Sequence, residues 1–291
     1  GRHLPALIRR MPKSYTWELY DPRDVHPDLQ TFADSKDESQ GRVVLVKERF
    51  TMETAAALKR QSRQHLFFIS DIRPADLSSK GDEEVEAEVV EDMAAQRSWI
   101  ELLRPAASLL KFRLPWSPGK TAYLSGQLLV QAFGPCTSTE TRLFSSKAAL
   151  KEGHVEYDHQ TYWEQLMYHN TVRRAQLHRL VPPLKAQLSI VEGLDKCYDC
   201  MALVCTVRQY LETMKEEETF SDGQLLEEVD AIIKEIADEG RTLATPYFVS
   251  TTRRDGIAFE DHPSRAKRAR YGGDESNLQS GAPSKRLCEK K

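Results

Sequence analysis

Long apolar runs are missing from this chain of 291 residues. No hydrophobic stretch approaches the ~20 residues that a membrane-spanning helix needs, so we predict no membrane partner. Internal repeats are absent, and no charged-then-apolar targeting segment follows Gly1. Because a natural chain begins with Met, we expect a fragment or a processed product. With 40% hydrophobic and 29% charged residues, the composition is that of a soluble globular protein with one substantial core.

Cysteine is scarce and follows no regular pattern. The five cysteines are odd in number, and Cys197 and Cys200 form a C-x-x-C without the second pair that would complete a zinc site. The pair also lies in a helix-like stretch. We therefore predict small apolar residues in a reducing cell interior, and no metal site.

Positive charge is concentrated at the C-terminal end. The net charge of the whole chain is -3, but residues 262–291 contain 8 basic and 3 acidic residues. Few apolar residues and much Gly, Ser and Pro predict a disordered basic tail over 240–291. Its RAKRAR run at 265–270 fits a nuclear-import signal or an RNA-tethering arm, and a plain solvated tail explains it equally well. We expect a nuclear protein, or a cytoplasmic one if the source is viral.

The first part of the chain alternates between strand-like and helix-like segments. Short apolar or aromatic runs bounded by Pro, Asp and Gly predict strands at 15–20, 43–47 and 66–70. Strong helix formers behind a Thr cap predict a helix over 51–61, and apolar residues at helical spacing predict another over 83–103.

Three further strand-like runs follow, at 107–114, 126–133 and 141–145, with no long helix between the last two. A βαβαβ order that ends in a run of strands is typical of an α/β sheet with an antiparallel edge, flanked by helices. The remaining helix-like segments are 159–180, 197–214 and 223–240. The first of these carries an aromatic stripe that includes Trp163, which we expect to face the core.

Three polar residues lie at the ends of predicted buried strands. Asp71 follows the strand at 66–70, Lys111 lies within the next strand, and Glu140 precedes the last. Strand ends of an open α/β sheet face the ligand crevice, so the lysine is expected between two carboxylates. Burial makes a lysine a better proton acceptor for a hydroxyl, while nearby carboxylates oppose that change. The alternative is a lysine that snorkels from an edge strand beside an Asp that caps a turn.

The N-terminal residues look like the second half of a nucleotide-binding turn. Gly1 runs straight into helix-like sequence, as happens after a glycine-rich turn whose free amides hold a cofactor. Asp21 ends the next predicted strand, where such folds place an acid for the ribose hydroxyls. The alternative for Asp21 is a turn residue of the DPRD segment.

One aromatic residue and one acid suit a nucleobase. Trp116 lies between prolines on the loop after Lys111, where it can stack on a base, and a cationic base such as 7-methylguanine adds ~1–2 kcal/mol of attraction. Glu164, beside Trp163, can accept hydrogen bonds from a guanine edge. A core tryptophan and a solvated glutamate are the alternatives.

These residues together resemble a known family. Asp71 in ISDIR, Lys111 in SLLKFRLPW, Glu140 in AFGPCTSTETRLF and Glu164 in YWEQLMY resemble, in order and spacing, the poxvirus-type cap-specific mRNA 2'-O-methyltransferases and their giant-virus and trypanosomatid relatives. The resemblance implies a methyltransferase domain over 1–239, with a Rossmann-like sheet that binds S-adenosylmethionine and carries a Lys-Asp-Lys-Glu tetrad.

The resemblance assigns roles residue by residue. Asp71, Lys111 and Glu140 match the last three tetrad members, with Lys111 activating the ribose 2'-hydroxyl. The cofactor would be bound by Gly1 and His3 in the glycine turn, Asp21 and Arg23 after the second strand, Phe50 and Thr51 beside the adenine, and Ile72 and Arg73 beside the catalytic Asp. The RNA would be contacted by Trp116 on the methylated cap base, Glu164 at its edge, and Arg142.

The sequence also departs from this family. The first tetrad lysine and the opening strand would lie before Gly1. Pro118 stands where the family has a second acid, and Thr137 where it has an aromatic residue. These departures would fit methylation of a nucleotide beyond the first.

The sequence therefore predicts an mRNA cap 2'-O-methyltransferase whose partners are capped mRNA and other capping or polymerase proteins. The fragment itself is expected to be inactive. Two alternatives remain open: a non-catalytic RNA-binding or scaffolding module on the same fold, and a small-molecule methyltransferase.

Overall fold

The computed structural model describes most of the chain between His3 and Ile236. The described residues are 3–35, 42–61, 65–72, 81–131, 138–173, 184, 187, 188, 191, 194, 198–214 and 220–236. Gly1, Arg73, Thr137, Cys197 and the predicted tail at 240–291 lie outside them. Within the described ranges, none of the helices combines the length and the apolar character needed to cross a bilayer.

Helices and strands alternate through the N-terminal third. They are α1 (Leu4–Arg10), β1 (Thr16–Tyr20), α2 (Pro27–Asp34), β2 (Arg42–Val46) and α3 (Met52–Arg60). The strands β1 and β2 pair in parallel as a two-stranded sheet, with Thr16 opposite Arg42. The predicted Thr cap is confirmed, because Thr51 Oγ1 accepts from the Thr54 amide at 3.3 Å.

The central sheet has four strands in the order β3-β4-β7-β6. These are β3 (Phe67–Ser70), β4 (Ala107–Phe112), β7 (Thr141–Ser146) and β6 (Gln127–Leu129). β3 is parallel to β4, and β7 is antiparallel to both of its neighbours. The prediction of a mixed α/β protein with an antiparallel part of the sheet is confirmed, and the antiparallel strand β7 lies one place in from the edge.

Two strands and two helices were not predicted. β5 (Lys120–Leu124) pairs with β8 (His154–Asp158), and α2 and the short helix α5 (Lys147–Lys151) were also missed. Neither sequence shows regular apolar alternation, because β5 has its two buried residues, Tyr123 and Leu124, next to each other and β8 is largely exposed. The strand predicted at 126–133 is shorter, and β6 ends at Leu129.

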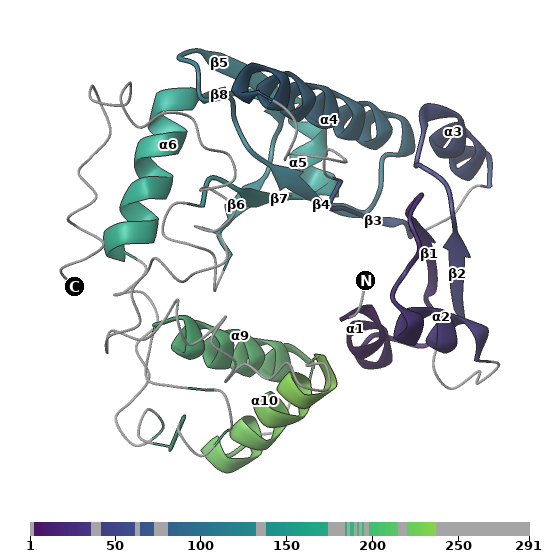
Figure 1. The fold of residues 1–291 in the computed structure, drawn as a ribbon, viewed down its shortest axis with the longest axis vertical. Helices are drawn as coiled ribbons and strands as arrows, with labels where there is room; N and C mark the ends of the chain where they lie inside the picture. The colour runs from purple at the N-terminus through teal and green to yellow at the C-terminus, as the bar shows by residue number, and fades with distance from the viewer. Residues whose placement is uncertain are drawn as a thin grey trace.

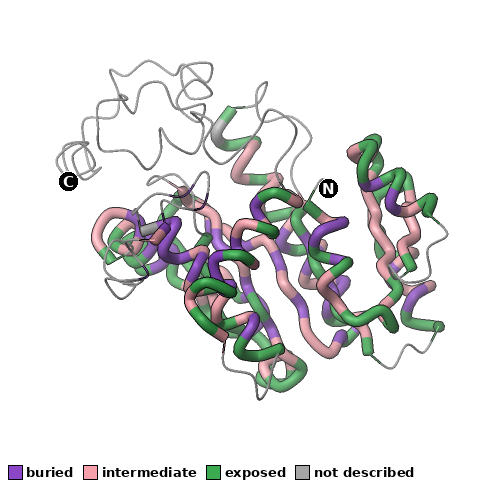
Figure 2. The backbone as a smooth tube through the Cα atoms, turned by 90° about the horizontal axis from the view of Figure 1, so that it is seen from below, coloured by how far each residue is buried: buried purple, intermediate pink, exposed green. Residues whose placement is uncertain are grey.

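One face of the central sheet is covered by the long helix α4 (Asp82–Leu103), as Figure 1 shows. Alternate strand residues point to this face, and they form a single buried cluster with side chains of α4 and of α6 (His159–Tyr168). Buried positions, purple in Figure 2, run along both the strands and the helices. Members of the cluster include Phe68, Met93, Ile100, Leu110, Phe112, Leu143, Tyr162 and Leu166.

The opposite face of the central sheet carries exposed apolar side chains. Phe67, Ile69, Phe144 and Leu129 are all among the exposed large hydrophobic residues. The rings of Tyr15 and Phe67 lie 5.9 Å apart and connect the start of β1 with the start of β3. Among the described residues, however, no strand pairs with both β1 and β3.

A second buried cluster is formed by the C-terminal helices. After α6, a π-helical turn covers His169–Arg173, and α9 (Tyr198–Met214) and α10 (Asp222–Ile236) then pack together. In Figure 1 these two helices lie on the side of the sheet away from α4, next to α1. Arg9 pairs with Glu235 at 2.7 Å, and the Tyr210 hydroxyl donates to the Arg10 carbonyl at 3.3 Å. The C-terminal helices are thereby joined to the first helix of the chain.

Candidate functional site

Four charged side chains close into a ring at one end of the central sheet. Lys111 Nζ lies 3.0 Å from Glu140 Oε2 and 3.8 Å from Asp71 Oδ1. Arg142 completes the ring, with Nη1 2.6 Å from Glu140 Oε1 and Nη2 2.8 Å from Asp71 Oδ1. Positive and negative groups therefore alternate around what we call the four-charge ring. The three strand-end residues singled out in the sequence lie together, as predicted.

Strand pairing explains why these side chains meet. Lys111 of β4 and Arg142 of β7 are direct register partners on the same sheet face, and Glu140 lies two residues before Arg142. Two cations directly opposite each other destabilise a sheet, so the carboxylates of Asp71 and Glu140 offset that repulsion. β4 lies between β3 and β7, and the Lys111 side chain is only 16% exposed. The alternative of a lysine that snorkels from an edge strand is therefore wrong.

The charges of the ring act on the ionisation of Glu140. Burial alone would raise the pKa of this carboxyl, but the ion pairs with Arg142 and Lys111 outweigh burial and hold its pKa below the ordinary value. Glu140 is consequently a carboxylate at neutral pH. Asp92 on α4 also interacts with Lys111. The pKa of its carboxyl group is raised, because the effect of burial is larger than the opposing effect of the positive charge on Lys111.

Arg142 is turned toward protein groups. Its side chain is 15% exposed and, besides the two carboxylates, donates to the Thr141 carbonyl at 3.2 Å. With its amide oxygen toward the guanidinium, Gln131 accepts from Nη1 and Nη2 at 3.2 and 3.0 Å. The resemblance places Arg142 against RNA, whereas in the structure its donors bind and orient both ring carboxylates.

Five of the residues predicted to bind a cofactor follow the carboxyl ends of β1, β2 and β3, namely Asp21, Arg23, Phe50, Thr51 and Ile72. The centre of the Phe50 ring lies 5.1 Å from that of Tyr20 at the end of β1 and 5.2 Å from that of Phe68 in β3, so Phe50 packs between these two strands. Ile72 packs against the same cluster. Thr51 caps α3, and His3 is exposed at the start of α1.

Asp21 is already engaged by its neighbour. Its carboxylate accepts from the Arg23 amide at 2.9 Å and from the Arg23 guanidinium at 3.1 Å through both oxygens. These contacts hold the pKa of Asp21 below its ordinary value, against the smaller effect of burial. The turn that was the alternative explanation for Asp21 is therefore present, and its carboxylate remains 40% exposed at the strand end.

Two stacked tryptophans connect the loop that follows β4 with the helix α6. The indole rings of Trp116 and Trp163 are parallel, with an interplanar angle of 1° and centres 4.1 Å apart. The Arg113 guanidinium also lies over Trp116, 5.5 Å from the ring centre, and pairs with Glu86 of α4. Trp163, expected to face the core, is half-buried and does pack against the main buried cluster, and it also stacks on the exposed Trp116. We call Trp116, Trp163 and Arg113 the tryptophan platform.

Two helices hold the platform loop in place. Trp163 Nε1 donates to the Pro115 carbonyl at 2.9 Å, and the Trp116 amide donates to Glu86 Oε2 at 2.9 Å. His159 is buried at the start of α6. Its Nδ1 lies 2.6 Å from the Ser117 carbonyl oxygen, and its Nε2 lies 2.8 Å from Thr121 Oγ1. The loop is thus fixed by side chains from α4 and α6.

The helix α6 also connects the platform with the four-charge ring. The hydroxyl of Tyr162 donates to the Thr139 carbonyl at 3.1 Å and lies 3.2 Å from Thr141 Oγ1, on either side of Glu140. Trp163 is the next residue along the helix. Tyr162 and Trp163, which are successive residues of α6, therefore hold the segment around Glu140 and the tryptophan platform.

Glu164 has a partner on its own helix. Gln160 Nε2 donates to Glu164 Oε1 at 2.8 Å, and the Glu164 side chain is otherwise exposed to solvent. The structure gives no contact between Glu164 and Trp116. Its predicted role at the edge of a base stays a prediction.

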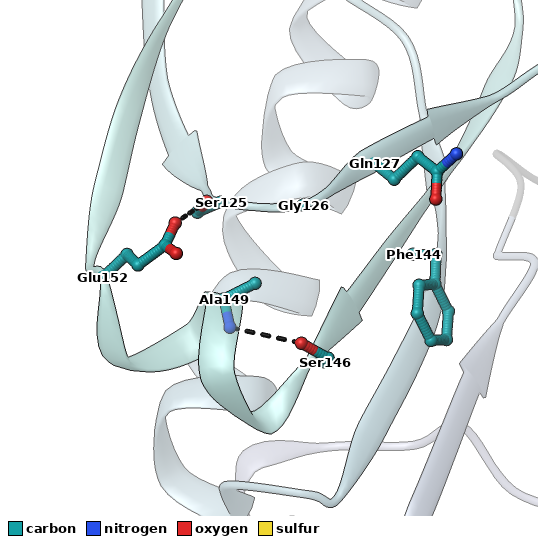
Figure 3. Close-up of a pocket in the computed structure, with 7 residues that line it drawn as sticks. All are labelled: Ser125, Gly126, Gln127, Phe144, Ser146, Ala149 and Glu152. Atoms are coloured by element: carbon teal, nitrogen blue, oxygen red, sulfur yellow. Dashed lines mark hydrogen bonds between the residues drawn. The ribbon is translucent and has the colours of Figure 1, made fainter.

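An open pocket of about 310 Å³ lies beyond the other end of β7 (Figure 3). Its lining comprises Ser125, Gly126, Gln127, Phe144, Ser146, Ala149 and Glu152. Ser125 Oγ donates to Glu152 Oε2 at 2.8 Å, and Ser146 Oγ accepts from the Ala149 amide, both drawn as dashed lines. None of the residues predicted from the sequence lines it.

Sequence reasoning missed several members of the site. The place of Arg142 in the ring could have been predicted, because Glu140 directly precedes β7 and Arg142 lies two residues further, so the two side chains point to the same face. Glu86, His159 and Gln131 have no comparable signal, since they approach from segments far away in the sequence.

A solved structure similar to this chain is that of bluetongue virus VP4, which its authors describe as a multifunctional RNA-capping production line. The TM-score is 0.39 and the sequence identity 12%, over 57% of this chain and 31% of VP4. This chain therefore spans less than a third of VP4. At this degree of likeness the comparison carries no argument about activity.

A family model gives the firmer comparison. The model of the poly(A) polymerase regulatory subunit matches residues 1–180, which is more than half of the 291 residues. The match includes the four-charge ring and the tryptophan platform, and it does not itself show the poxvirus-type methyltransferase family named from the sequence. The chain belongs to the poly(A) polymerase regulatory subunit family.

Proposed function

We propose that this protein is an mRNA cap 2'-O-methyltransferase that transfers a methyl group from S-adenosylmethionine to a ribose 2'-hydroxyl near the 5' end of capped mRNA. The observation that carries the proposal is the position of Lys111, a barely exposed amine between the carboxylates of Asp71 and Glu140. In its neutral form such an amine is oriented to accept the proton of a hydroxyl, so the proton that the two ion pairs hold on Lys111 has to leave before methyl transfer. In this role Glu140 and Asp71 hold the amine in place, and Arg142 holds the two carboxylates.

The strand order supports a Rossmann-like methyltransferase sheet. The parallel pair β2-β1 and the sheet β3-β4-β7-β6, with β7 antiparallel, fit an α/β sheet whose carboxyl ends face one ligand site. A strand between β1 and β3 would join the two parts.

The side chains at the ends of β1 and β2 fit S-adenosylmethionine in their chemistry. The half-exposed Asp21 carboxylate suits the ribose hydroxyls, which would replace donors of Arg23, and Phe50 offers an aromatic wall for the adenine. Thr51, Ile72 and His3 complete the proposed binding residues. The cofactor, when bound, supplies an activated methyl group on its sulfonium sulfur.

The test is the substitution Lys111→Ala in the full-length protein. Because the general base is lost, methyl transfer to capped RNA should fall by about 10²–10⁴-fold while binding of S-adenosylmethionine persists. Lys151→Ala, which removes an exposed lysine of α5, is the matched control and should leave transfer unchanged. Retained transfer in Lys111→Ala would refute the proposal.

A second candidate function follows from the family. Its description names a regulatory subunit of poly(A) polymerase, so we also propose a polymerase or capping protein as a partner and a non-catalytic role beside it. If this role is the main one, Lys111→Ala should leave stimulation of the polymerase unchanged. A polyadenylation assay with and without the variant separates the two functions.

A further inference from the structure

We infer that His159 is a positioning residue for RNA binding, and that it acts by fixing the platform loop (residues 113–119). The inference rests on the proposed function, because it concerns RNA held at the same site. His159 is the first residue of α6 and only 6% exposed. It belongs to neither the four-charge ring nor the tryptophan platform.

Three polar groups of His159 contact the end of the platform loop and the start of β5. The His159 amide donates to the Gly119 carbonyl at 3.0 Å. Nδ1 lies 2.6 Å from the Ser117 carbonyl oxygen, and Nε2 lies 2.8 Å from Thr121 Oγ1. The loop also packs on the ring, since a Cβ added at Gly119 would lie 3.5 Å from His159 Cε1. One residue therefore holds every second position from 117 to 121.

The roles of the two ring nitrogens follow from their partners. The Ser117 carbonyl oxygen can only accept, so Nδ1 donates to it. Nε2 of the neutral ring then accepts from the Thr121 hydroxyl. Because the ring is buried and both nitrogens are occupied, His159 acts on RNA through the loop that it holds.

His159 holds the second half of the platform loop. The first half is bonded to Trp163 of α6 and to Glu86 of α4. The second half, residues 117–119, is exposed to solvent. Among the described residues, every hydrogen bond that reaches this half from outside the loop comes from His159. Removing the imidazole therefore loosens the second half and leaves the first half bonded.

The position of the loop matters for RNA because β4 leads from Lys111 directly into it. RNA with a ribose at Lys111 would lie along the loop, where Trp116 is 55% exposed. The same helix also holds the segment around Glu140, since the Tyr162 hydroxyl donates to the Thr139 carbonyl at 3.1 Å. The first residue of α6 thus positions the loop, and Tyr162 positions part of the four-charge ring.

The experiment measures binding of a 5'-capped oligoribonucleotide to the full-length protein by fluorescence anisotropy, without S-adenosylmethionine. His159→Ala should weaken binding about tenfold, because the second half of the loop is no longer held in one conformation. His159→Asn should recover most of the affinity, since its amide can donate to the Ser117 carbonyl as Nδ1 does. His154→Ala, which removes an exposed histidine of β8, is the matched control and should leave the affinity unchanged.

Steady-state kinetics separate this positioning from a general loss of structure. His159→Ala should raise KM for capped RNA about tenfold and change kcat by less than about twofold. Tyr162→Phe, which loses the hydrogen bond beside Glu140, should instead lower kcat and leave KM unchanged. A fall in kcat that is as large in His159→Ala as in Tyr162→Phe would contradict the assigned role.

RNA binding that survives in His159→Ala would overturn the inference. An equal loss in His154→Ala, a loss that His159→Asn does not relieve, or a wild-type protein that does not bind the oligoribonucleotide would overturn it as well. The binding assay contains no cofactor and measures no turnover, so its outcome is independent of the Lys111→Ala test. A protein that binds RNA in the expected order of variants but transfers no methyl group would refute the proposed function alone.

Discussion

The four-charge ring and the tryptophan platform lie at the same end of β4 but are built in different ways. The ring consists of residues at strand ends, and its distances follow from the pairing of β3, β4 and β7. The platform consists of a loop residue and a helix residue that meet across 47 positions of sequence, with side chains from α4 and α6 holding them. Sheet register therefore fixes the charged part of the site, and long-range packing fixes the aromatic part.

Breaking the ring should have the largest effect on stability. Glu140→Gln leaves Lys111 and Arg142 opposite each other with one carboxylate fewer, so the free energy of unfolding should fall by about 2 kcal/mol. Urea denaturation measures this change. The matched control is Glu156→Gln, because Glu156 pairs with Lys120 at 3.2 Å on the exposed β5-β8 sheet and should change stability by about 0.5 kcal/mol or less. Equal effects of the two variants would show that the ring contributes no more than a surface pair.

The pH dependence of the free energy of unfolding is a second test of the four-charge ring. The pKa of Glu140 is lowered in the folded protein from the ordinary value of 4.5. The stability that the ionised carboxylate contributes is therefore fully present at pH values above that ordinary pKa. It is lost as the pH falls through the lower, folded pKa. Wild type should lose more stability than Glu140→Gln when the pH is lowered from about 6 to about 3, and parallel curves would contradict the assigned cause.

Breaking the platform should have a smaller effect on stability and a distinct spectroscopic one. Trp163→Phe removes the hydrogen bond to Pro115 and part of the stacking, at a cost of about 1 kcal/mol. The exciton signal of two stacked indoles in circular dichroism should disappear in both Trp163→Phe and Trp116→Phe. In Tyr168→Phe, the control on the same helix, both the signal and the stability should remain, and a signal that survives in Trp163→Phe would contradict the stack.

The same contrast explains what the sequence could predict. Short apolar runs predicted the buried strands beside Asp71, Lys111 and Glu140, and strand ends of an α/β sheet share an edge, so their meeting was predictable. The stack of Trp116 on Trp163 was not, since helical spacing assigned Trp163 to the core and nothing local indicates a partner 47 residues away. The strands β5 and β8 were missed because neither sequence shows apolar alternation: the buried residues of β5 are adjacent, and β8 is largely exposed.

The contacts of α1 with the C-terminal helices matter for where the chain can be cut without disturbing its packing. The family match ends at residue 180, yet Arg9 and Arg10 at the end of α1 pair with Glu235, and Arg10 also pairs with Glu228. An expression boundary drawn at the end of the family match would remove α9 and α10 and expose the side of α1 that they cover. The part of the chain that the family model matches therefore leaves out two helices that pack against its first helix.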